Sequence, residues 1–489
     1  MKNLIEQIEA LSKEANLLEI DSSERLHLLR EVGMFSDQYI SRLPNAFSFT
    51  HKPVDKERLQ IKQETSSLPE LLQIFEEEVT EPGLRAASGG HIGYIPGGGI
   101  YAAALGDFLA AISNEYAGVS YASPGAVAIE NEVIDWLKRI FSFPKSAVGN
   151  LASGGSISNM IALTAARDKH LVKNEKILKS VIYLSRQAHH CIKKSLRIIG
   201  LEDVIIRHPE LDEEFRIIPH SLNAQIMEDK KNGLFPFLVI ATAGTTDVGV
   251  IDPLDEIATI ARKNNMWFHV DAAYGGFFIL TSRKGLFHGI EKADSLVVDP
   301  HKGMFLPYGL GAVLIKDVEA VLHSNNYQAN YMQDAIMEDL SFDPANLSPE
   351  LTKHFRGMRL WLPLRLHGIK PFIACLEEKL LLTEYFRKRL VEMGFKVGPQ
   401  PDLSVSYFWF PTDKNENEFN QTLMNYIHDD GRVFFSSTRL NGRFVIRMAI
   451  LSFRTKIGTI DRALDMIRDC LRKTQSDVMK DQVTSGDLI

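Results

Sequence analysis

The sequence predicts an α/β protein in which a mostly parallel seven-stranded sheet is covered by helices and followed by a smaller α+β domain. Short runs between residues 148 and 315 are almost entirely apolar and rich in Val, Ile and Phe, which is typical of strands buried on both faces. Helical patterns separate several of these runs, and this alternation favours a parallel sheet. Such sheets bind ligands beyond the carboxyl ends of their strands, so function is expected directly after the apolar runs.

The predicted strands of this sheet cover 148–152, 181–185, 204–207, 237–242, 267–270, 295–298 and 312–315. The clearest helix between them is predicted at 252–264, with Asp252 as its N-cap and Pro253 at its first helical position. We therefore assign residues 86–365 to one large α/β domain.

The C-terminal region, residues 366–489, is predicted to be a separate small domain. Its expected elements are a long helix at 371–393, strands at 405–410, 432–436 and 443–450, a helix at 459–473, and a polar, frayed tail.

The N-terminal region, residues 1–85, is predicted to be helical. Asp21 and Glu24 are spaced as in a capping box and precede an apolar run. These short amphipathic helices lack a core of their own, so we expect them to pack on another surface.

Composition excludes several functional classes. The 489 residues carry a formal charge of −7, whereas domains that track nucleic-acid phosphates are usually basic. Cys191, Cys375 and Cys470 are odd in number and far apart, which predicts neither a disulfide framework nor a CxxC metal site and suits a reducing compartment. No signal peptide is visible, and the apolar stretch 94–113 is interrupted by Pro, Gly and Asp, so neither export nor membrane insertion is predicted and we expect a cytoplasmic protein.

Polar residues follow three of the predicted strands. Asp271 and small residues come after 267–270, and Lys302 lies in the tight sequence that follows 295–298. After 148–152 the chain has glycines and Ser156 at the start of a helical pattern, where free N–H groups and the helix dipole favour an anion.

Pyridoxal phosphate needs this whole set of groups. It requires a lysine for its Schiff base, a carboxylate on its pyridine nitrogen, and a phosphate site. The carboxylate keeps the nitrogen protonated, so that the ring can accept electrons from a bond breaking at the substrate α-carbon. Taken alone, each residue is more simply explained as a turn, a cap or an ordinary surface group, so the prediction depends on their combination.

The chain resembles the group II pyridoxal-phosphate-dependent amino-acid decarboxylases, which include the aromatic-L-amino-acid, histidine and glutamate decarboxylases. The matching stretches lie between about residues 20 and 473, and they are 122–124, 153–159, 187–189, 242–246, 269–274, 299–302 and 355–361. The resemblance implies fold type I, the aspartate-aminotransferase architecture, and an obligate homodimer with shared active sites, in which residues 1–85 form the dimerisation segment.

The resemblance also implies a role for each matching residue. Lys302 would be the Schiff-base lysine, Asp271 the partner of the pyridine nitrogen, and His189 the residue stacked on the ring. The other cofactor residues would be Gly155 and Ser156 with His301 at the phosphate, Ala273 beneath the ring, and Thr246 near the ring substituents and holding Asp271.

Two departures from the aromatic-acid members affect the expected substrate pocket. The segment before Pro96 contains His91 and Tyr94 in place of consecutive aromatic residues, which predicts a more polar wall. No tyrosine occurs in 339–356, where family members carry a proton donor on a mobile loop, and Phe342 stands nearest that position. Tyr331 and His189 are the alternative donors.

Three hypotheses follow. The first is decarboxylation of an L-amino acid to its amine and carbon dioxide, and the second is decarboxylation coupled to oxidative deamination, which a phenylalanine at 342 favours. The third is a catalytically silent scaffold, which the presence of Lys302, Asp271 and His189 disfavours. A zinc enzyme is disfavoured because the His and Cys residues are not spaced to aim three ligands at one metal. The sequence leaves the identity of the amino acid open.

Overall fold

A seven-stranded sheet forms the centre of the chain. The structure is a computed structural model that describes residues 1–325 and 343–486, with side chains up to residue 477. The strand order is β3-β9-β8-β7-β6-β4-β5. The strands are β3 Val148–Ala152, β4 Ser180–Leu184, β5 Ile205–Arg207, β6 Phe235–Thr242, β7 Trp267–Asp271, β8 Ser295–Val298 and β9 Gly311–Ile315. Strand β9 runs antiparallel to both neighbours and the other pairs are parallel, so the predicted mostly parallel sheet is confirmed.

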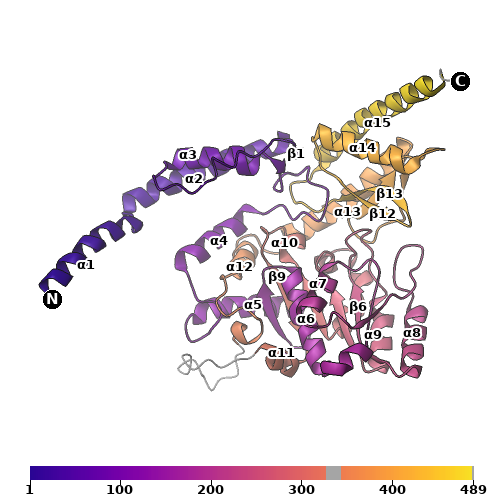
Figure 1. The fold of residues 1–489 in the computed structure, drawn as a ribbon, viewed down its shortest axis with the longest axis horizontal. Coiled ribbons are helices and arrows are strands. Elements are labelled where there is room, and N and C mark those ends of the chain that lie inside the picture. Colours follow the sequence, from indigo (N-terminus) through magenta and orange to yellow (C-terminus); the bar gives the residue numbers. More distant parts are fainter. Residues whose placement is uncertain (326–342, 487–489) are drawn as a thin grey trace.

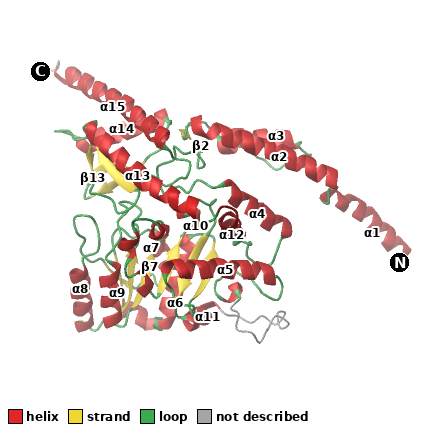
Figure 2. Cartoon of the chain, turned by 180° about the vertical axis from the view of Figure 1, so that it is seen from behind, coloured by secondary structure: helices red, strands yellow, loops and turns green. Residues whose placement is uncertain are grey.

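Helices enclose this sheet, and two buried apolar clusters fill the space between the layers (Figure 2). The helices are α4 Tyr101–Ser113, α5 Pro124–Phe141, α6 Gly155–Lys169, α7 Cys191–Ile198, α8 Pro219–Lys231, α9 Leu254–Lys263, α10 Pro300–Gly303, α11 Val318–Asn325 and α12 Met358–His367. Strands β4 and β7 are buried along their whole length, as expected for strands covered on both faces.

The predicted cap of α9 is wrong. The helix begins at Leu254, and Asp252 points away from it. The Asp252 carboxylate is buried and accepts hydrogen bonds from the backbone N–H groups of Ile217, at 2.9 Å, and Thr242, at 2.8 Å. Asp252 therefore connects the end of β6 to the neighbouring loop at Ile217. A buried carboxylate is stable only with hydrogen-bond donors, and these two N–H groups supply them.

A four-stranded antiparallel sheet with helices on it forms the C-terminal domain, in the order β10-β11-β13-β12. Its elements are β10 Lys396–Val397, β11 Val405–Trp409, β12 Ser436–Leu440, β13 Arg443–Ala449, α13 Lys370–Glu392, α14 Glu416–Asp430 and α15 Ile457–Gly486. The strand predicted at 432–436 is misplaced, since β12 starts where that prediction ends. The predicted tail is also wrong up to Gly486, because α15 continues through it.

The N-terminal helices form an arm that extends away from the rest of the chain (Figure 1). They are α1 Lys2–Ala15, α2 Ser22–Arg42 and α3 Leu68–Ile74. The predicted cap of α2 is confirmed, because Asp21 Oδ1 accepts from Glu24 N at 2.9 Å. Neither α1 nor α2 has a buried residue. The arm joins the body through β1 Phe49–Thr50, which pairs with β2 Gly83–Leu84.

None of the described helices is both long and apolar enough to cross a membrane. The division of the chain at residues 85 and 365 stays a prediction.

Candidate active site

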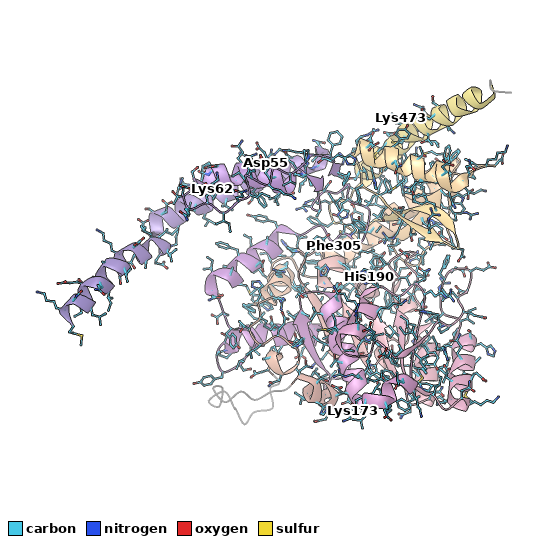
Figure 3. The ribbon with its side chains drawn as sticks, viewed as in Figure 1. Asp55, Lys62, Lys173, His190, Phe305 and Lys473 are labelled. Atoms are coloured by element: carbon cyan, nitrogen blue, oxygen red, sulfur yellow. The ribbon has the colours of Figure 1, made fainter. Side chains whose placement is uncertain are left out.

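A cavity of about 260 Å³ opens at the carboxyl ends of the parallel strands. Figure 3 labels His190 and Phe305 at this end of the sheet, which faces the C-terminal domain. The lining residues are Ser153, Gly154, Gly155, Ser156, Ile157, Asn159, His189, Cys191, Thr242, Thr246, Asp271, Ala273, Tyr274, Asp299, His301 and Lys302. The structure therefore brings together all eight residues that the sequence predicted for the cofactor, from segments up to 150 positions apart.

One wall of the cavity is a glycine turn that leads into α6. Gly154 has φ 156° and ψ 176°, a conformation that glycine adopts easily and other residues rarely do. A Cβ atom on Gly155 would lie 2.9 Å from Asp299 Oδ2 and 3.3 Å from the Ala273 side chain. The start of this fifteen-residue helix lines the cavity, and N–H groups at a helix start that have no acceptor in the helix can bind an anion there.

Lys302 is held by a carboxylate that the sequence analysis left without a role. Its Nζ lies 2.9 Å from Asp299 Oδ2, and Asp299 is 2% exposed. Burial alone would lower the pKa of Lys302, but the charges of Asp299 and Asp271 more than offset it, and the pKa is raised. The other oxygen, Asp299 Oδ1, is buried without a hydrogen-bond partner among the described residues. The sequence signal that could have identified Asp299 is an acidic residue directly after a predicted buried strand.

Asp271 lies at the carboxyl end of β7 and is 6% exposed. Burial raises its pKa, while hydrogen bonds and the nearby Lys302 work in the opposite direction. Within the described chain, its carboxylate accepts from Ala273 N at 3.1 Å and from Asn159 Nδ2 at 3.3 Å. Thr246, expected to help hold this carboxylate, lines the same cavity and accepts instead through its backbone oxygen from Arg447 Nε at 2.8 Å.

His189 presents a neutral imidazole. Its Nδ1 accepts from the backbone N–H of Cys191 at 3.3 Å, which places the ring proton on Nε2. Burial, with the nearby His190 and Lys302, lowers the pKa of His189 to about 4. A neutral, partly buried ring suits stacking against a flat ligand better than an imidazolium does.

His301 lies beside the glycine turn and is also held by a hydrogen bond to the backbone. Its Nδ1 donates to the backbone oxygen of Leu310 at 2.6 Å, which fixes the ring, and its Nε2 is 3.7 Å from Asp299 Oδ2. Burial lowers the pKa of His301, and the charge of Asp299 opposes that effect.

Two of the three residues predicted for the substrate pocket lie in the described part of the chain, and neither lines the cavity. His91 is buried against Phe434 of the C-terminal domain, with ring centroids 6.0 Å apart, and does not line the cavity formed by one chain. Tyr94 is 58% exposed and also lies outside it. Phe342 and the alternative donor Tyr331 lie outside the described residues. A substrate role for these residues stays a prediction.

The described groups fit pyridoxal phosphate in three respects. The amine of Lys302 can react with the aldehyde, the carboxylate of Asp271 can pair with the ring nitrogen, and the start of α6 can take the phosphate. The orphaned Asp299 Oδ1 adds an independent sign that the site is completed by a polar ligand.

Comparisons with known proteins agree with this chemistry. Residues 52–409 match the family described as the pyridoxal-dependent decarboxylase conserved domain. An aromatic-L-amino-acid decarboxylase of Bacillus atrophaeus is 33% identical over 374 residues, which are 74% of this chain and 77% of that protein. A phenylacetaldehyde synthase of Petunia hybrida is 29% identical over 401 residues, 77% of this chain and 79% of that protein.

Among solved structures, tryptophan decarboxylase of Catharanthus roseus in complex with L-tryptophan superposes with a TM-score of 0.84. The match covers 93% of this chain and 99% of that one at 23% identity, so it shows a shared fold. The matched family domain spans the whole seven-stranded sheet and part of the C-terminal domain, so the chain belongs to the pyridoxal-dependent decarboxylase family.

Proposed function

We propose that this chain removes the α-carboxylate of an L-amino acid as carbon dioxide and releases the amine, with its pyridoxal phosphate bound covalently through Lys302. One observation carries the proposal. The Lys302 amine, the Asp271 carboxylate and the N-terminal turn of α6 converge on one buried cavity. Bound pyridoxal phosphate supplies an electron sink for the bond that breaks at the substrate α-carbon.

The chain's own residues would orient and charge this site. Asp299 holds Lys302 Nζ at 2.9 Å and aims it into the cavity, next to the glycine turn that would hold the phosphate. Asp271 would keep the ring nitrogen protonated, with Thr246, Ala273, Ser156 and His301 around the cofactor. A lysine released by the incoming substrate is also positioned to move a proton at the reacting carbon.

The neutral His189 would cover the face of the ring and keep water from it. Its low pKa means that it can do so without placing a second positive charge beside Lys302 at neutral pH. This arrangement keeps the site's positive charge on the lysine.

For the substrate we propose an aromatic L-amino acid first. The support is the Bacillus atrophaeus relative, whose name specifies this class, at 33% identity. His91 and Tyr94 are proposed to reach the substrate pocket only when a second chain completes it.

Oxidative deamination to an aldehyde is the second candidate. It is favoured by the lack of a tyrosine in 339–356 and by the relationship to the phenylacetaldehyde synthase of Petunia hybrida. In that case Phe342 would take the place of a proton donor.

We further propose a homodimer with shared active sites. Helices α1 and α2 bury none of their residues within the chain, although they carry apolar side chains. Helix α4 is also partly uncovered, with exposed large apolar side chains at Tyr101, Leu105, Phe108, Leu109 and Ile112. The arm of one chain would cover this surface of the other. A cytoplasmic location is proposed as well, because Cys191 and Cys470 are buried free thiols.

The test is to offer the common amino acids to the purified holoenzyme and to measure carbon dioxide, amine, aldehyde and hydrogen peroxide for each. Amine and carbon dioxide in equal amounts, without peroxide, support decarboxylation. Aldehyde with peroxide supports the second candidate. No product from any amino acid, with the cofactor bound, would refute both.

A further inference from the structure

A continuous chain of buried hydrogen bonds reaches Asp271 from the interior of the sheet. Trp267 Nε1 donates to Ser295 Oγ at 2.8 Å, and the same oxygen lies 2.8 Å from His269 Nδ1. The other ring nitrogen, His269 Nε2, is 2.7 Å from Asn159 Oδ1. Asn159 Nδ2 in turn lies 3.3 Å from Asp271 Oδ2, and all five residues are buried.

Trp267, the first residue in this series of hydrogen bonds, determines which group donates in each of them. An indole N–H can only donate, so Trp267 occupies one acceptor position of Ser295 Oγ. The hydrogen bonds of this hydroxyl within the described residues go to Trp267 and His269, which leaves its proton for His269 Nδ1. Burial lowers the pKa of His269 to about 3, so the ring is neutral and carries its proton on Nε2. That proton is donated to Asn159 Oδ1.

This order fixes the amide of Asn159. With Oδ1 engaged by the imidazole, Nδ2 faces Asp271 Oδ2 and, at 3.6 Å, Cys191 Sγ. An amide N–H stabilises a carboxylate more than a carboxylic acid, whose carbonyl oxygen is a weaker acceptor. The reversed order would need a protonated Asp271 and would leave the Ser295 hydroxyl without an acceptor among the described residues, which is costly in a buried site.

We infer that Trp267, Ser295, His269 and Asn159 form a one-directional relay that holds Asp271 as an anion aligned with the ring nitrogen of the cofactor. These four are positioning residues, since they act through Asp271. The inference rests on the proposed role of Asp271.

The relay has a physical task. Burial raises the pKa of Asp271 and so works against the charged form that the ring nitrogen needs. The backbone N–H of Ala273 also donates to this carboxylate and favours its charge. The titratable groups that face it are Lys302, which favours its charge, and Asp299 and the Cys191 thiol, which do not. The amine of Lys302 is also the group that would react with the cofactor aldehyde, so its charge changes when the cofactor binds. The relay supplies Asp271 with a hydrogen-bond donor that does not depend on the charge of Lys302.

The test compares two ligands on the full chain stripped of cofactor. One is pyridoxal phosphate, and the other is its analogue with carbon in place of the ring nitrogen. Ser295→Ala removes one oxygen from the relay. Ser158→Ala is the matched control, because Ser158 is an equally buried serine beside Asn159 whose hydroxyl has no hydrogen-bond partner among the described residues.

We expect Ser295→Ala to weaken binding of pyridoxal phosphate by about tenfold, the usual worth of one buried hydrogen bond, and to leave binding of the carbon analogue unchanged. Asn159→Ala should weaken it more, by roughly 10- to 100-fold, because the lost bond is to a charged group. The control should bind both ligands as the unaltered chain does. Trp267→Phe tests the same relay if Ser295→Ala does not fold.

Two results would overturn the relay alone. In one, Ser295→Ala and Trp267→Phe bind pyridoxal phosphate normally. In the other, they weaken both ligands equally, as a general loss of packing would. If the unaltered chain itself binds the two ligands equally well, the pairing of Asp271 with the ring nitrogen fails, and the proposed role of Asp271 fails with it.

Discussion

Asp299→Asn should change the charge of Lys302 with little change of shape. Asparagine keeps an oxygen that can accept from Lys302 Nζ, now 2.9 Å from Asp299 Oδ2, but removes the negative charge. That charge is the main reason why the pKa of Lys302 is raised in spite of burial. A nearby negative charge favours the charged form of an amine, so we expect the pKa of Lys302 to fall in the variant.

The assay is the rate at which the full chain, stripped of cofactor, captures pyridoxal phosphate as the pH is raised. Only the neutral amine attacks the aldehyde, so the rate rises with pH up to the pKa of Lys302. In Asp299→Asn the rise should move to lower pH, and capture at neutral pH should be about 10- to 1,000-fold faster. Asp229→Asn is the control, since Asp229 is a buried carboxylate that pairs with Tyr183 and Arg207 outside the cavity.

An unmoved pH profile in Asp299→Asn would refute this account of Lys302. Faster capture with an unmoved profile would show a different effect, the loss of repulsion between Asp299 and the phosphate, and would equally remove Asp299 as the group that sets the lysine's charge.

The remaining predictions concern the same site and the arm. Borohydride should fix the cofactor on Lys302, and Lys302→Ala should lower kcat at least about a thousandfold; mass spectrometry that finds the adduct elsewhere would contradict this. Asp271→Asn should keep the fold but lower kcat roughly a hundredfold or more, because a charge-assisted bond in a buried site is lost; near-normal turnover would mean that another group holds the ring nitrogen. Removal of residues 1–85 should give aggregated or unfolded chain, and a soluble, active monomer in sedimentation would contradict the proposed dimer. Phe342→Tyr should raise the ratio of amine to aldehyde, provided that the unaltered enzyme forms aldehyde.

The sheet was predictable because its strands carry their own signal. Runs such as 181–185 and 267–270 are apolar at nearly every position, which is typical of strands with helices packed on both faces of the sheet. The C-terminal domain was harder. Strand β12 contains exposed polar residues, and its apolar neighbour, residues 432–435, reads more like a strand from sequence although in the structure it pairs only through a single bridge between Phe434 and His91.

The cap predicted at Asp252 failed for a related reason. A carboxylate before a helical pattern is usually a cap, and sequence cannot show that this one is buried. In the fold it is fully enclosed and binds two backbone N–H groups from other segments, which are contacts between residues up to 35 positions apart.

In the site, sequence identified the residues whose chemistry is distinctive and missed those that act by position. Lys302 and Asp271 lie in short motifs at strand ends, and their residue types indicate their chemistry. The role inferred for Asn159 and His269 depends on a hydrogen bond between residues 110 positions apart. Asp299 lies within the matching stretch 299–302, but its role depends on its short distance to Lys302. The sequence does not show that distance or the burial of the ion pair.

The C-terminal domain contacts a residue that lines the cavity. Arg447, on β13, is 3% exposed and donates both to the backbone oxygen of Thr246 at the cavity and to that of Tyr94 at 2.9 Å. Burial lowers the pKa of Arg447 to about 10, which still leaves the guanidinium charged at neutral pH. One buried cation thus connects the loop of Thr246 and the segment of Tyr94 to the same strand. Backbone oxygens carry no signal of their own in the sequence, so this connection follows from the fold and from no local pattern.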